Sequence, residues 1–217
     1  MKVKICGLNN PENLQAIQVF NPDFLGFIFY EKSPRCLDLN RMEKPIQDLE
    51  TNAEKVGVFV DAPIDQVLAY SQLLGLDYCQ LHGDESLDYV KTIKAAGLKI
   101  IKVFRIGKAG IQKQQLDAFD GLCDYFLFDT NTKNYGGSGK KFDWAIINQY
   151  KGKTPFILSG GIGPEDAALI KQVDHPMFAG VDLNSRFESE PGMKNTDSLN
   201  QFFTALKNQQ SYELFNR

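Results

Sequence analysis

The chain has 217 residues, of which 43% are hydrophobic, and it carries a formal net charge of −3. This size and composition fit a soluble globular fold with a large core, and no linker divides the chain, so residues 1–217 are predicted to form one domain. The sequence has no basic block, which argues against nucleic acid as a partner, and no apolar run approaches the roughly 20 residues that a membrane helix needs.

Cysteine and histidine usage gives no sign of a metal site. The four cysteines and two histidines lack the spacing typical of metal ligands. The N-terminal residues enter a strand-like run without the apolar stretch of a secretory signal. A reducing, cytoplasmic location is therefore expected.

Short apolar runs alternate with helix-forming segments along the chain. Eight runs are predicted as strands, at residues 3–6, 24–30, 56–60, 78–81, 100–104, 125–128, 155–158 and 178–183. Helices are predicted at 63–70, at 164–170 and from 197 to about 213, whereas Pro45 interrupts the pattern near 39–49. Eight alternating units of about 27 residues each predict an α/β fold, a (β/α)8 barrel. An open doubly wound sheet is the alternative, but it usually has fewer strands.

Polar side chains are predicted to converge on the C-terminal rim of this barrel. Because strand side chains alternate between faces, Lys4 points to the barrel axis when Val3 and Ile5 face the helices. The same alternation turns four reactive groups and one amide inward, namely Cys6, His82, Asp129, Asp182 and Asn184. Each alone could be structural, as a small buried thiol, a satisfied histidine or a loop cap. Their convergence where barrel enzymes carry active sites favours catalysis.

Two glycine-bearing loops predict a phosphate site beside these groups. Residues 159–164 and 180–185 follow the seventh and eighth strands, where barrel enzymes commonly hold a phosphate. A P-loop is excluded, because residues 134–141 do not fit its spacing. Arg35 follows the second strand and could clamp a carboxylate, although a solvated loop arginine is the alternative.

Together these segments resemble the phosphoribosylanthranilate isomerase family. The matching stretches include Lys4-Ile5-Cys6-Gly7-Leu8, Gly26-Phe27-Ile28-Phe29 with Ser33-Pro34-Arg35, Gln80-Leu81-His82-Gly83-Asp84-Glu85, Phe128-Asp129-Thr130 with Gly136-Gly137-Ser138-Gly139, Ser159-Gly160-Gly161-Ile162 and Gly180-Val181-Asp182-Leu183-Asn184-Ser185. The likeness keeps its order from residue 2 to residue 194. It departs from the usual family pattern at two positions, Asn9 and Arg186. Arg186 could add a cation near the phosphate or crowd the phosphate loop.

The resemblance implies an enzyme of tryptophan biosynthesis that acts without metal or cofactor. Its reaction is the Amadori rearrangement of N-(5-phosphoribosyl)anthranilate to 1-(2-carboxyphenylamino)-1-deoxyribulose 5-phosphate, an aldose–ketose isomerisation. Cys6 matches the general base, Asp129 the general acid, and Arg35 the residue that holds the anthranilate carboxylate. The implied substrate-binding positions are completed by His82, Asp182, Gly136, Gly160, Gly161, Asn184 and Ser185. The expected partner is a small phosphosugar, and the chain is expected to be a monomer or a homodimer.

A thiol that acts as a base needs a lowered pKa, and Lys4, two residues before Cys6 on the same strand face, could supply the positive potential. Two alternatives remain open. Another phosphosugar isomerase or epimerase would need different rim residues, and a catalytically idle barrel would present a large exposed apolar patch to a partner.

Overall fold

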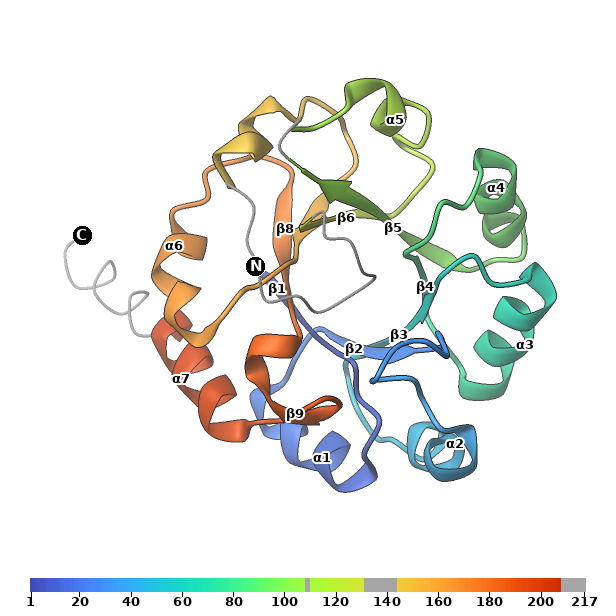
Figure 1. Ribbon diagram of the computed structural model, residues 1–217, viewed down its shortest axis with the longest axis vertical. Helices are drawn as coiled ribbons and strands as arrows, with labels where there is room; N and C mark the ends of the chain where they lie inside the picture. The colour runs from blue at the N-terminus through green and yellow to red at the C-terminus, as the bar shows by residue number, and fades with distance from the viewer. Residues whose placement is uncertain (108–109, 131–143, 208–217) are drawn as a thin grey trace.

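Eight parallel strands close into a barrel, each paired with the next and the last with the first (Figure 1). The computed structural model describes residues 1–107, 110–130 and 144–207. The strands are β1 (Lys2–Cys6), β2 (Phe24–Ile28), β3 (Glu54–Phe59), β4 (Tyr78–Leu81), β5 (Lys99–Ile106), β6 (Tyr125–Thr130), β7 (Phe156–Leu158) and β8 (Phe178–Leu183). The predicted (β/α)8 barrel is confirmed, and the open doubly wound sheet is wrong.

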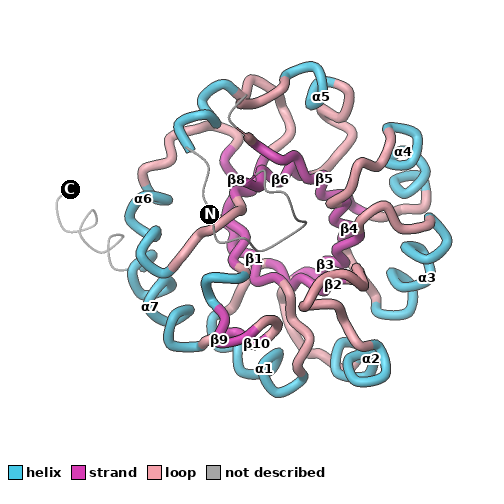
Figure 2. The backbone as a smooth tube through the Cα atoms, viewed as in Figure 1, coloured by secondary structure: helices cyan, strands magenta, loops and turns pink. Residues whose placement is uncertain are grey.

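Helices and helical turns surround the strands as an outer ring (Figure 2). They are α1 (Pro11–Ala16), η1 (Ile17–Phe20), α2 (Leu39–Gln47), α3 (Ile64–Leu74), α4 (Leu87–Ala95), α5 (Lys113–Asp117), η2 (Trp144–Gln149), η3 (Pro164–Asp166), α6 (Ala167–Lys171), η4 (Ser185–Phe187) and α7 (Thr196–Lys207). None of the helices within the described ranges combines the length and apolar character needed to cross a bilayer.

The sequence explains where two of the helices begin. Side-chain oxygens of Asn10 and Ser86 accept backbone N–H groups in the first turns of α1 and α4, which are N-cap contacts. α2 continues through Pro45, because its buried Met42 and Ile46 anchor one face of the helix to the core. The interruption expected at this proline is therefore wrong. The predicted end of the last helix, near residue 213, lies outside the described residues.

Two apolar layers form the core. The larger layer lies between the strands and the helices and includes Ile5, Phe126 and Phe128. A smaller cluster fills the barrel interior and includes Phe24 and Tyr78, which pack edge to face with ring centroids 5.5 Å apart. The inner aromatics come from the first residues of their strands, so they close the N-terminal end of the barrel and leave the C-terminal end for polar groups.

A short hairpin between β8 and α7 was not predicted. It consists of β9 (Glu188–Glu190) and β10 (Met193–Lys194), which pair antiparallel. The strands are only three and two residues long, too short to give a periodic apolar signal in the sequence.

Candidate active site

A cavity of about 770 Å³, including the open space at its mouth, lies at the C-terminal rim of the barrel. Its lining includes eight of the predicted site residues, namely Cys6, His82, Asp129, Gly160, Gly161, Asp182, Asn184 and Ser185. Arg35 does not line it, and Gly136 lies outside the described residues. The strand-end alternation thus brings the inward-facing groups of four strands into one pocket.

Cys6 lies beside a buried charged pair inside the barrel. The Lys4 ammonium is fully buried and donates a 2.9 Å hydrogen bond to Asp182 Oδ1, while Ser159 Oγ lies 3.2 Å from Asp182 Oδ2. A Cβ atom at Gly26 would lie 2.7 Å from Cys6 Sγ and 2.9 Å from Lys4 Nζ. The sulfur and the ammonium therefore share the space above this glycine, and a side chain there would displace one of them.

Burial raises the pKa of the Cys6 thiol, because the thiolate loses its water. The charge of Lys4 lowers this pKa and that of Asp182 raises it, and the pKa stays above its ordinary value. The lowered pKa expected for the base is therefore wrong for this structure, although Lys4 lies where the sequence predicts it. Burial also lowers the pKa of Lys4, but Asp182 and Cys6 outweigh it, so the pKa of Lys4 is raised and its ammonium stays charged.

Asp129 is oriented by its neighbours at the end of β6. Its Oδ1 accepts a 2.8 Å hydrogen bond from the Thr130 N–H, and its Oδ2 lies 3.4 Å from His82 Nε2. With the Gln80 amide oriented as in the structure, its Nε2 donates to His82 Nδ1 at 3.2 Å. A neutral His82 then carries its proton on Nε2, facing the carboxylate. Gln80 was not singled out from the sequence, although it shares the inward face of β4 with His82.

The glycine loop after β7 packs directly against this carboxyl group. Gly160 has φ of +89°, and a Cβ there would collide with the Thr130 side chain and lie 2.8 Å from Asp129 Oδ1. Only glycine lets the loop approach so closely. Arg186 pairs with Glu165 at 2.7 Å and does not line the cavity, so this ion pair joins η4 to η3.

Arg35 is buried instead of being a solvated loop residue, and that alternative is wrong. Its Nε and Nη2 bind the carboxylate of Glu188, with Nη2 to Oε2 at 2.6 Å. Lys194 Nζ donates to the same carboxylate at 2.6 Å and to Asn184 Oδ1 at 2.9 Å. Sequence analysis missed Glu188 and Lys194 because they belong to the unpredicted hairpin, where strand alternation gives no information.

The cavity also has an apolar wall, formed by Ile28, Tyr30, Val58 and Val60 at the ends of β2 and β3. This wall lies on the far side of β1 from the glycine loops of β7 and β8. One side of the cavity can thus contact an apolar group, while glycine-bearing loops line another side. Together with the thiol and the carboxyl group at the C-terminal rim, this arrangement places the molecule in the class of (β/α)8-barrel proteins whose rim carries a polar pocket, where barrel enzymes have their active sites.

Comparisons with known proteins identify the family within that class. The family model for N-(5'phosphoribosyl)anthranilate (PRA) isomerase matches residues 3–205. The N-(5'-phosphoribosyl)anthranilate isomerase of Parabacteroides distasonis is 46% identical over 208 residues, covering 95% of this chain and 93% of that protein. The chain therefore belongs to the N-(5'-phosphoribosyl)anthranilate isomerase family.

Two solved structures share the fold over nearly their full length. A phosphoribosyl anthranilate isomerase in complex with reduced 1-(o-carboxyphenylamino)-1-deoxyribulose 5-phosphate is 27% identical, with a TM-score of 0.77, and the match covers 96% of this chain and 99% of that chain. Monomers made from the dimeric enzyme of Thermotoga maritima are 28% identical, with a TM-score of 0.76 and coverage of 95% and 98%.

Proposed function

We propose that this chain converts N-(5-phosphoribosyl)anthranilate to 1-(2-carboxyphenylamino)-1-deoxyribulose 5-phosphate in tryptophan biosynthesis, an Amadori rearrangement. The observation that carries the proposal is one cavity lined by both Cys6 and Asp129, in a chain of this family. The relative solved with the reduced product analogue supports a phosphosugar as the substrate.

Asp129 is the proposed general acid. In its protonated form it gives its proton to the ribose ring oxygen. The C1–O bond of the furanose breaks as the lone pair of the anthranilate nitrogen forms the iminium ion, and Asp129 is left as the carboxylate. His82 and Thr130 hold the two carboxyl oxygens, which orients the acid toward the cavity. A well-placed general acid is worth about 10²–10⁴-fold in rate.

Cys6 is the proposed general base. Its thiolate takes the proton from C2 of the opened sugar, and the resulting enolamine tautomerises to the ketone. Burial disfavours the thiolate, whereas the fixed ammonium of Lys4 stabilises it. Asp182 holds that ammonium in place at 2.9 Å, so we assign Asp182 a positioning role in addition to its place in the cavity wall.

The phosphate and the aromatic ring of the substrate are proposed to bind on different sides of the cavity. Gly160, Gly161, Asn184 and Ser185 are the proposed phosphate contacts, and Arg35 is the proposed partner of the anthranilate carboxylate. The apolar wall on β2 and β3 suits the aromatic ring. Residues 1–217 are proposed to act as a single cytoplasmic domain, as a monomer or a homodimer.

The test is to incubate the pure protein with enzymatically generated phosphoribosylanthranilate and follow the loss of substrate fluorescence. The proposal predicts catalytic loss of fluorescence and formation of the ribulose product. Fluorescence that decays only at the rate of the protein-free control would contradict it.

A further inference from the structure

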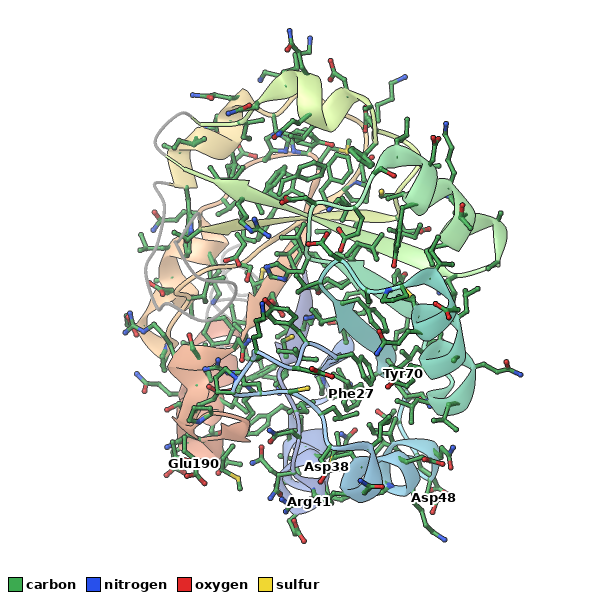
Figure 3. All side chains as sticks on the ribbon, turned by 45° about the vertical axis from the view of Figure 1, so that its right-hand side comes forward. Phe27, Asp38, Arg41, Asp48, Tyr70 and Glu190 are labelled. Carbon is green, nitrogen blue, oxygen red and sulfur yellow. The ribbon has the colours of Figure 1, made fainter. Side chains whose placement is uncertain are left out.

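Three charged side chains form a buried cluster behind the cavity wall. The side chain of Glu188 is 3% exposed, that of Arg35 10% and that of Lys194 0%. The carboxylate binds both cations, at 2.6 Å each. Glu190, at the other end of the same strand, is exposed at the outer edge of the molecule (Figure 3). Glu188 is thus the glutamate of this hairpin that faces inward.

The hairpin fixes the position of the Glu188 carboxylate. Lys194 lies opposite Glu188 in the register of β9 and β10, and Gly192 N–H donates to Glu188 Oε1 at 3.2 Å. Asn13 on α1 binds both the N–H and the carbonyl of Lys194, each at 2.8 Å. The carboxylate is therefore attached to the hairpin, and the hairpin is attached to the outer helix ring.

Glu188 in turn fixes the guanidinium of Arg35. It occupies Nε and one N–H of Nη2, so the edge formed by Nη1 and the rest of Nη2 stays free of Glu188. A planar guanidinium can bind a second carboxylate along that edge with two parallel hydrogen bonds. Because arginine has many rotamers, a side chain that is already held loses less freedom when the substrate binds.

The cluster reaches the cavity through Asn184 and Ser33. A Cβ at Gly7 would lie 2.8 Å from Arg35 Cδ and 2.9 Å from Asn184 Oδ1, so the arginine stem and the amide are neighbours. Arg35 N–H also donates to Ser33 Oγ at 3.1 Å. Both Asn184 and Ser33 line the cavity, which places Arg35 directly behind its wall.

We propose that Glu188 is a positioning residue for binding of the substrate carboxylate, because it holds the Arg35 guanidinium in one place beside the cavity wall. The proposal rests on the proposed function and extends it to the β9–β10 hairpin. Burial favours the neutral form of Glu188, but Arg35 and Lys194 outweigh it and lower its pKa, so the carboxylate stays charged. The opposite role, competition between Glu188 and the substrate for Arg35, predicts tighter substrate binding once Glu188 is removed.

The first experiment compares Glu188→Gln with Glu190→Gln, a matched change on the same strand. With N-(5-phosphoribosyl)anthranilate, Glu188→Gln should raise KM about tenfold and lower kcat less, because misplacement of a positioning group by about 1 Å can cost up to 10²-fold. Glu190→Gln should leave both constants unchanged. A KM that stays the same or falls in Glu188→Gln would overturn the proposal.

The second experiment is a double-mutant cycle with Arg35→Met. If Glu188 acts through Arg35, adding Glu188→Gln to Arg35→Met should change KM by less than twofold. Fully additive losses would show that Glu188 acts elsewhere and would contradict the proposal. Glu188→Asp keeps the negative charge, so its KM should lie between that of the wild type and that of Glu188→Gln. Thermal unfolding verifies that each variant is folded.

Calorimetric binding of the reduced product analogue gives the same comparison without turnover. Weaker binding in Glu188→Gln than in Glu190→Gln is expected, and equal affinities would overturn the role of Glu188. A wild-type protein that binds the analogue but does not convert substrate would contradict the proposed function alone. The two failures are therefore distinguishable.

Discussion

The two ends of the barrel are built from the same strands but serve different purposes. At the N-terminal end, β2, β4 and β6 begin with Phe24, Tyr78 and Tyr125, whose rings contact one another inside the barrel. At the C-terminal end, β1 and β6 deliver Cys6 and Asp129 to an open cavity. One end is closed by apolar packing and the other holds buried polar groups. Stability and chemistry should therefore respond separately to substitutions at the two ends.

The largest effect is expected at the rim, for Cys6→Ser and Asp129→Asn. Each should lower kcat by about 10²–10⁴-fold, because each removes one proposed proton transfer. The free energy of unfolding should change little, since both substitutions nearly preserve side-chain volume. Steady-state kinetics and denaturant titration measure the two quantities. Near-normal turnover in either variant would remove that residue from the mechanism.

The opposite response is expected at the closed end, for Phe24→Ala. Phe24 is fully buried, and its ring contacts Tyr78 and Tyr125 at centroid distances of 5.5 and 5.8 Å. Removing it should cost about 3–5 kcal/mol of unfolding free energy. The kcat per folded molecule should remain that of the wild type. A large loss of kcat in fully folded protein would show that the two ends are coupled.

A smaller effect is expected when a glycine within a strand is replaced, and it depends on whether that glycine lies beside the cavity. Gly26→Ala would place a methyl group against Cys6 Sγ and Lys4 Nζ, and it should lower kcat about 10²-fold through displacement of the thiol. Gly57→Ala is the control, because its methyl group would meet Leu76 and Phe59 away from the cavity. That control should lose stability but keep its kcat. Equal effects of both variants on kcat would refute the specific role of Gly26.

The smallest effect concerns the titration of the thiol. Since the pKa of Cys6 is raised, the thiolate forms only at alkaline pH, and its fraction increases as pH rises through that pKa. The difference in ultraviolet thiolate absorbance between wild type and Cys6→Ser should have its midpoint above the ordinary pKa of a cysteine thiol, because burial disfavours the thiolate. The subtraction removes the absorbance of the other three free cysteines, which both proteins contain. A midpoint near neutrality would contradict the conclusion that burial affects the pKa of Cys6 more strongly than the charge of Lys4 does.

Strand periodicity was sufficient to predict the fold and the direction of the rim side chains. The apolar residues Val3 and Ile5 fix which face of β1 meets the helices, so Lys4 and Cys6 have to point inward. The same period-two rule applies to Gln80 and His82. These features are local, so they can be predicted without knowledge of tertiary contacts.

Other features depend on contacts between distant segments. Glu188 meets Arg35 across 153 positions of sequence, and Lys194 meets Asn13 across 181. Nothing in a short hairpin indicates such partners. The raised pKa of Cys6 also could not be predicted, since it follows mainly from complete burial among residues of other strands.

A crystal structure of the protein with the reduced product analogue tests the central claim most directly. The account predicts that C2 of the sugar lies about 3–3.5 Å from Cys6 Sγ, a distance suited to proton transfer, with Asp129 on the other side of the sugar and the phosphate against Gly160 and Gly161. A ligand bound with its sugar carbons remote from the thiol, or with its phosphate away from these loops, would contradict it.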